Sequence, residues 1–197
     1  MRLRAINCTH SIYQGTTWLA TMAESLVILS SLRHTPHSPG PVSDLLNALG
    51  PVESSRLTAP FIFGAGVIIA GGFIRVKAFQ TLGPLFTFQQ CLRKEHKLIT
   101  SGPYAMVRHP GYGGLLMCLV GWCIVHGSPG SWLRTSGVLG AGWVRAGVMC
   151  WCLLTAACIA TVLRRSAEED EFLSRRFGKE WESWAGKVKY KLVPFVY

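Results

Sequence analysis

The sequence predicts an all-α integral membrane protein with about four transmembrane helices. Three observations lead to this fold class. Apolar residues make up 49% of the 197 residues, charged residues make up only 15%, and four apolar runs approach or reach the length of a membrane span. A soluble domain of this size would carry about 25% charged residues. The low charge and the positive mean hydropathy therefore favour a membrane protein over a soluble domain.

Each predicted span is a separate apolar run. The first is the weakest, because it is barely long enough and contains Glu24. The last is longer than a membrane requires, so we expect it to tilt or to begin as a turn at the interface. A stretch rich in Pro, Ser and His, residues 33–58, predicts a loop between the first two spans. The spans are expected at about Thr16 to Leu32, Ala59 to Phe79, Pro110 to His126 and Ser136 to Leu163.

Small residues within the apolar runs suggest how the helices pack. Pairs four residues apart predict close helix approach, namely Gly66 and Ala70, Gly137 and Ala141, and Gly142 and Ala146. Five cysteines also lie in these runs, and none belongs to a C-x-x-C pair. We expect them to be reduced packing residues. They are Cys118, Cys123, Cys150, Cys152 and Cys158.

The basic residues predict both the partner and the orientation. A net charge of +10 is compatible with nucleic acid or with anionic lipid as partner. Lys and Arg cluster at the ends of the apolar runs, which indicates a lipid bilayer and not nucleic acid. If the N-terminus, residues 80–109 and the tail after Leu163 share one side, that side holds most of the 20 Lys and Arg residues. The positive-inside rule then places both termini in the cytosol.

The tail after Leu163 predicts one amphipathic helix. Its apolar side chains recur at intervals of four and three, at Leu173, Phe177, Trp181, Trp184 and Val188. Two pairs at i,i+4 support it, Glu171 with Arg175 and Arg176 with Glu180. We expect this helix to lie on the membrane surface with its Trp residues among the headgroups. Arg165 and Glu169 are also four apart, and they form either a simple salt bridge or part of a site.

Residues 96–114 are the richest polar segment. Arg108 and His109 directly precede Pro110, and Pro suits the first position of a helix. The free amides of such a helix start favour an anion, and the guanidinium of Arg108 matches a carboxylate. Tyr104 and Tyr112 offer ring faces to a flat or cationic group. The segment therefore predicts a site for a polar ligand beside the third span.

Other kinds of site are not indicated. No glycine-rich strand-to-helix nucleotide motif is present, because Gly64 and Gly66 are followed by apolar residues inside a span. His96 and His109 lack neighbouring Cys or carboxylate partners in the sequence, so we predict no metal site.

Two motifs in this order resemble those of the isoprenylcysteine carboxyl methyltransferases, which share a membrane superfamily with phospholipid methyltransferases. The first, at residues 96–114, reads H-x-L-[VI]-T-x-G-P-Y-x-x-V-R-H-P-x-Y-x-G. The second, from Arg165 onward, reads R-x-x-x-E-[ED] and is followed by F-G-x-E-[YW]. The resemblance covers about Gln89 to Phe195. The chain departs from it at Asp170 (often Glu), at Gly111 (commonly Ser) and at Trp181 and Trp184 (more usually Tyr).

The resemblance implies a single membrane methyltransferase domain over residues 1–197, with N-terminal spans in 1–79 and a catalytic core in 80–197. The core would hold a cofactor loop, a helical hairpin and a C-terminal helix, which together form a cytosolic pocket for S-adenosylmethionine. Arg165 would bind the substrate and act with Glu169 as the catalytic pair. The implied cofactor contacts are Gln89, His96, Lys97, Leu98, Ile99, Tyr104, Arg108, His109, Pro110, Gly111, Tyr112 and Glu169.

The implied activity is methylation of the C-terminal carboxylate of a prenylated cysteine, in proteins that carry a farnesyl or geranylgeranyl group, at the endoplasmic reticulum membrane. That carboxylate is ionised at neutral pH, so it needs no general base, and the cationic Arg165 suits it. Three alternatives stay open. They are a phospholipid N-methyltransferase, which would need a base, a non-enzymatic four-span lipid-binding or scaffold protein, and a membrane reductase that uses a nicotinamide cofactor.

Overall fold

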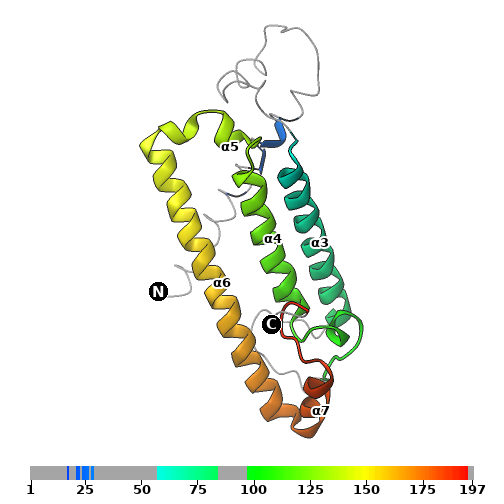
Figure 1. Cartoon of the computed structure of the whole chain (residues 1–197). Helices are drawn as coiled ribbons and strands as arrows, with labels where there is room; N and C mark the ends of the chain where they lie inside the picture. The colour runs from blue at the N-terminus through cyan, green and yellow to red at the C-terminus, as the bar shows by residue number, and fades with distance from the viewer. Residues whose placement is uncertain are drawn as a thin grey trace. The chain divides into compact units, whose positions relative to one another are not determined.

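The computed structural model of the protein describes residues 17, 21, 22, 24–26, 28, 57–83 and 97–194, and these contain helices and no strand (Figure 1). The predicted all-α class is therefore confirmed for this part of the chain. The helices in chain order are α3 (Ala59–Leu82), the 3₁₀ helix η3 (Gly102–Ala105), α4 (Pro110–Gly127), α5 (Trp132–Thr135), the 3₁₀ helix η4 (Val138–Gly140), α6 (Gly142–Phe177) and α7 (Lys179–Lys187).

Three helical stretches are long and apolar enough to cross a membrane. They are α3, the segment Pro110–Thr135 and α6. Their apolar parts agree with the second, third and fourth predicted spans. The first predicted span lies largely outside the described residues, although residues 17, 21, 22, 24–26 and 28 are helical.

The tail helix predicted after Leu163 is wrong in its bounds. Helix α6 has 36 residues and runs without interruption from the apolar run into the charged tail, as far as Phe177. Gly178, at φ 51°, then ends α6, and α7 begins at Lys179. The predicted stripe is consequently divided between two helices. The predicted pair of Arg176 and Glu180 spans this break, so the i,i+4 geometry of a continuous helix does not apply to it.

The start of the fourth span follows the alternative prediction of an interfacial turn. Gly137 adopts φ 77°, a left-handed conformation that Gly reaches without steric cost. Val138–Gly140 form the 3₁₀ helix η4, and α6 begins only at Gly142. The apolar run is therefore shortened before it becomes a regular helix.

By its contacts the chain divides into two compact units. One contains residues 1–65 and 122–156, and the other contains residues 66–121 and 157–197. The single methyltransferase domain remains a prediction. All contacts described below lie within one unit or the other.

In the second unit, α3 and α4 approach at two glycines. A Cβ atom on Gly71 would lie 2.6 Å from the carbonyl oxygen of Gly114, and one on Gly114 would lie 2.6 Å from the carbonyl oxygen of Gly71. The predicted small-residue pairs do not mark this approach, since a Cβ on Gly66, Gly137 or Gly142 would meet nothing within 4 Å. The five cysteines named above are free thiols, as predicted, but Cys123, Cys150 and Cys152 are exposed and not packed.

Candidate active site

The polar segment before α4 is held by the chain that follows α7. The backbone N–H of Arg108 donates to the carbonyl of Tyr190 at 3.0 Å, and that of His109 donates to the carbonyl of Lys191 at 2.8 Å. Pro110 is fully buried and is the first residue of α4, as its position in the sequence predicted. These contacts fix the direction in which Arg108 and His109 leave the backbone.

Asp170 is the centre of the site. Its Oδ1 lies 2.9 Å from Nε2 of His109, and its Oδ2 accepts from Nη1 of Arg108 at 2.8 Å. The Nζ atom of Lys191 lies 3.7 Å from the same Oδ2. The side chains of Arg108 and Asp170 are only 12% and 9% exposed. A charge this buried is tolerable because several partners of opposite charge surround it.

The guanidinium of Arg108 has further contacts. Its Nη2 donates to the carbonyl of Lys189 at 3.1 Å, and its Cζ lies 5.8 Å from the ring centroid of Trp181, in cation–π range. Two buried donors in this area, Nε of Arg108 and Nε1 of Trp181, have no hydrogen-bond partner among the described residues. Most of the donors that were expected to meet a ligand carboxylate therefore serve Asp170 and the backbone.

Glu169, Arg165 and Tyr112 form the second part of the site. The Tyr112 phenol lies beside the side chains of Glu169 and Arg165. Oε2 of Glu169 lies 3.8 Å from Nδ1 of His109, and the His109 and Tyr112 rings stack with their centroids 5.8 Å apart. His109 is thus placed between Asp170 and Glu169. Arg165 and Glu169 are therefore both near Tyr112, and Glu169 is also close to His109.

Tyr104 adds an aromatic wall from η3. Its carbonyl accepts from Nε1 of the buried Trp184 at 3.2 Å, which ties η3 to α7. Burial raises the pKa of the Tyr104 phenol well above its usual range, and the charge of Glu169 and the neighbouring Tyr112 raise it further. Tyr104 therefore stays protonated at neutral pH, with its side chain beside the Glu169 carboxylate.

The remaining predicted residues are less central. The carbonyl of Gly111 accepts from Nη1 of Arg75 at 2.9 Å, so Gly111 links α4 to α3. Lys97 is exposed, while Leu98 and Ile99 are half-buried. Gln89 and His96 lie outside the described residues.

Sequence reasoning did not identify Asp170 and Lys191 as part of the site. A signal for Asp170 was present. The buried positions Val162, Ser166 and Asp170 follow at intervals of four and continue the stripe that begins at Leu173. An acidic residue on the apolar face of a helix requires a partner, and Arg108 and His109 of the first motif were candidates for it.

Known proteins with similar sequences include methyltransferases. The chain matches the family model of phospholipid methyltransferases over residues 59–145. It is 34% identical over 135 residues to a probable protein-S-isoprenylcysteine O-methyltransferase from Oryza sativa subsp. indica. The aligned region covers 68% of this chain and 60% of that protein. It is 31% identical over 136 residues to protein-S-isoprenylcysteine O-methyltransferase B from Arabidopsis thaliana, with coverage of 68% and 59%. These matches confirm the family resemblance that the motifs predicted.

The chain also matches, at lower identity, a protein named for a different activity. The chain is 28% identical over 105 residues to a delta(14)-sterol reductase from Schizosaccharomyces pombe, which covers 51% of this chain and 20% of that protein. The chain spans about 60% of the length of its plant relatives and much less of the reductase.

Proposed function

We propose that this chain, a relative of the isoprenylcysteine carboxyl methyltransferases, transfers a methyl group from S-adenosylmethionine to the C-terminal carboxylate of a prenylated cysteine. One observation supports this most strongly. His109, from the first motif, contacts Asp170 at 2.9 Å and Glu169 at 3.8 Å, both from the second motif. Two motifs about 60 residues apart, each typical of the family, thus form one cluster of side chains.

The residues of the cluster fit S-adenosylmethionine. When bound, this cofactor supplies a methyl group attached to a positively charged sulfur. Glu169 offers a negative charge, and Tyr104 and Tyr112 beside it offer ring faces, which attract a cation. The unpartnered donors of Arg108 and Trp181 remain available to an acceptor. The proposed cofactor residues are those expected from the motifs, with Asp170 added as the residue that positions Arg108 and His109.

Arg165 is proposed to bind the substrate carboxylate. It is exposed and lies within the first turn of α6 after the apolar run ends at Leu163. Tyr112 lies close to both Arg165 and Glu169, so the three side chains stand together in the proposed site. Since an ionised carboxylate needs no base, catalysis depends mainly on holding two reactants in line, which can contribute several kcal/mol.

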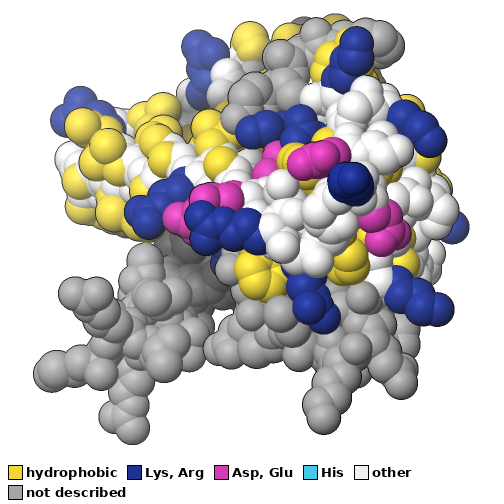
Figure 2. All heavy atoms as spheres, turned by 90° about the horizontal axis from the view of Figure 1, so that it is seen from below, with side chains coloured by type: hydrophobic (Ala, Val, Ile, Leu, Met, Phe, Trp, Pro, Cys, Tyr) yellow, Lys and Arg dark blue, Asp and Glu magenta, His cyan; other side chains and the backbone are white. Residues whose placement is uncertain are grey.

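The proposed setting is a membrane of the endoplasmic reticulum, with four spans and with the site and both termini in the cytosol. Large apolar side chains are exposed on the helices that could span it, for example Ile69 and Phe73 on α3 and Leu153 on α6. Such residues suit contact with lipid. Figure 2 shows the end of the molecule that carries α7, where Lys and Arg side chains stand with Asp and Glu between them. This basic end supports a cytosolic position. A prenyl chain would then reach the site from the bilayer.

Methyl transfer from labelled S-adenosylmethionine to N-acetyl-S-farnesylcysteine tests the proposal. We expect a base-labile methyl ester with the native chain, and a loss of at least about a hundredfold with Glu169→Gln, because the residue that balances the positive charges is removed. Glu171→Gln is the matched control, since Glu171 is on the same helix in an exposed pair with Arg175. Arg165→Ala should abolish ester formation, while Arg164→Ala, at the adjacent exposed pair with Glu168, should preserve it.

The same assay separates the rival activities. Label in phospholipid and none in the ester would reject carboxyl methylation in favour of a lipid N-methyltransferase. Binding of NADPH in place of S-adenosylmethionine would instead favour the reductase. A folded protein that binds neither S-adenosylmethionine nor NADPH, and whose stability is unchanged by Glu169→Gln, would favour a non-enzymatic role.

A further inference from the structure

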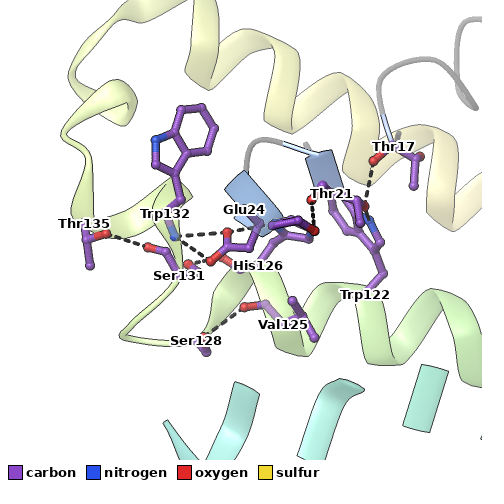
Figure 3. Close-up of polar contacts among 11 residues, drawn as sticks. Thr17, Thr21, Glu24, Trp122, Val125, His126, Ser128, Ser131, Trp132 and Thr135 are labelled. Atoms are coloured by element: carbon purple, nitrogen blue, oxygen red, sulfur yellow. Dashed lines mark hydrogen bonds and ion pairs between the residues drawn. The ribbon is translucent and has the colours of Figure 1, made fainter. Parts of the chain in front are cut away.

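The first unit contains a buried acid–base pair that the proposed function does not use. Glu24 is 3% exposed and His126 is 4% exposed. Oε2 of Glu24 lies 3.6 Å from Nδ1 of His126, and both Glu24 oxygens accept from the backbone N–H of Trp132, at 2.9 and 3.0 Å (Figure 3). Glu24 lies in an apolar run and His126 ends another. Ionisable groups in such positions are costly to bury, so they indicate a specific role.

The corner that receives Glu24 is built by its own side chains. Oγ of Ser131 donates to the carbonyl of His126 at 2.7 Å, and Oγ of Ser128 donates to the carbonyl of Val125 at 2.9 Å. These bonds satisfy carbonyls at the end of α4, which a helix leaves without partners. Trp132, the first residue of α5, donates instead to Glu24, which lies 108 residues earlier in the chain. Glu24 is therefore a long-range contact at a corner that is otherwise locally organised.

The described residues between 17 and 28 are helical, and one face of this N-terminal helical segment meets the corner. Thr17, Thr21 and Glu24 follow at intervals of four and three, so they share a helix face. Nε1 of Trp151 donates to the Thr17 hydroxyl and Nε1 of Trp122 donates to the Thr21 hydroxyl, both at 3.4 Å. Met22 and Leu26, by contrast, are exposed. This combination of polar contacts and exposed apolar side chains suits a helix surrounded by lipid.

The aromatic side chains extend the same contact. The Trp122 ring lies 4.0 Å, centroid to centroid, from the His126 ring and also 4.0 Å from the Trp151 ring. His126 thus contacts the tilted ring of Trp122 as well as approaching Glu24. Its position is fixed on the side that faces the N-terminal segment, as Figure 3 shows for the labelled residues.

We propose that Glu24, through His126 and the backbone N–H of Trp132, forms a buried polar latch that holds the N-terminal helical segment on the corner between α4 and α5. In a bilayer, apolar helices gain little from association by hydrophobicity, because lipid is as apolar as they are. Polar contacts must then hold them together. Loss of the Glu24 carboxylate removes the contacts with both His126 and the backbone N–H of Trp132, and loss of His126 leaves the buried carboxylate with fewer partners, which is unfavourable. Loss of the pair therefore releases the segment.

The latch is tested by cutting the chain between the N-terminal helical segment and the rest of the protein. A protease site is introduced within residues 34–55, the predicted loop, and the full-length protein is cleaved in lipid nanodiscs of phosphatidylcholine. The rate at which the N-terminal fragment leaves on dilution into detergent is then measured. We expect slow release from the otherwise native chain, and release at least about tenfold faster for Glu24→Gln and for His126→Gln.

A charge exchange makes the result specific. The double variant Glu24→His with His126→Glu restores the pair with its members reversed, and we expect it to recover slow release. Glu168→Gln, at an exposed pair with Arg164, is the matched control and should release like the native chain. Equal release from native and Glu24→Gln proteins, or no recovery in the exchanged variant, would overturn the latch. The measurement involves no methyl transfer, so its outcome is independent of the proposed function.

Discussion

Asp170→Asn is expected to lower the free energy of unfolding by about 3 kcal/mol, because it removes a buried carboxylate that faces three basic groups. The buried Arg108 and the half-buried Lys191 would lose the charge of this carboxylate, and His109 would keep only the more distant Glu169, at 3.8 Å. We also expect methyl transfer to fall about a hundredfold, since both motif residues would move from their positions. Chemical denaturation in detergent measures the first effect, and the farnesylcysteine assay measures the second.

The control for Asp170→Asn is Glu168→Gln on the same helix. Glu168 pairs with Arg164 at 2.7 Å, but both side chains are well exposed, so the expected change in stability is below about 0.5 kcal/mol. Because Asp170 acts through its neighbours, Asp170→Glu should recover part of the activity. A variant Asp170→Asn that matched Glu168→Gln in stability and in methyl transfer would mean that the cluster does not organise the site.

Gly71→Ala is expected to destabilise the protein by about 2 kcal/mol, as an overpacked helix contact does. The new Cβ would lie 2.6 Å from the carbonyl oxygen of Gly114 and 2.9 Å from Cβ of Met117, so α3 and α4 would have to separate. Arg75, one turn further along α3, would then lose its hydrogen bond to the carbonyl of Gly111. The midpoint of thermal unfolding in detergent measures the change.

Gly72→Ala is the matched control for this contact. Gly72 is the next residue of the same helix, and a Cβ there would meet nothing within 4 Å. Ala is the better helix former by up to about 1 kcal/mol, so this variant should be neutral or slightly stabilised. Equal unfolding temperatures for the two variants would contradict the close approach of α3 and α4.

The sequence was informative where a local rule applied. Pro110 marked the start of α4 because a missing N–H costs nothing at that position, and the apolar runs located the described helices that could span a membrane. The bounds of α6 were harder to predict. No Pro or Gly occurs between Leu163 and Phe177, so the helix continues past the end of the apolar run, whereas a hydropathy pattern registers only where the apolar residues stop.

Contacts between distant residues could not be predicted in the same way. Asp170 is one residue from Glu169, yet successive helix positions differ by about 100° in direction, so the two carboxylates approach different nitrogens of His109, and Asp170 also meets Arg108. The pairing of Glu24 with His126 joins separate apolar runs, and no periodicity within either run specifies it. The glycines that meet, Gly71 and Gly114, are on different helices, so spacing within one helix did not reveal them.

The continuity of α6 sets the depth at which chemistry would occur. The 36 residues of this helix extend about 54 Å, against about 30 Å for the hydrocarbon of a bilayer, and they include no joint between the anchoring part and Arg165. The length of the apolar run would therefore determine how far the reacting groups lie from the hydrocarbon of the bilayer. One residue added to that run would raise the site by about 1.5 Å and turn Arg165 by about 100°. Selection on such a protein would act on the length of its apolar run as strictly as on its reactive side chains.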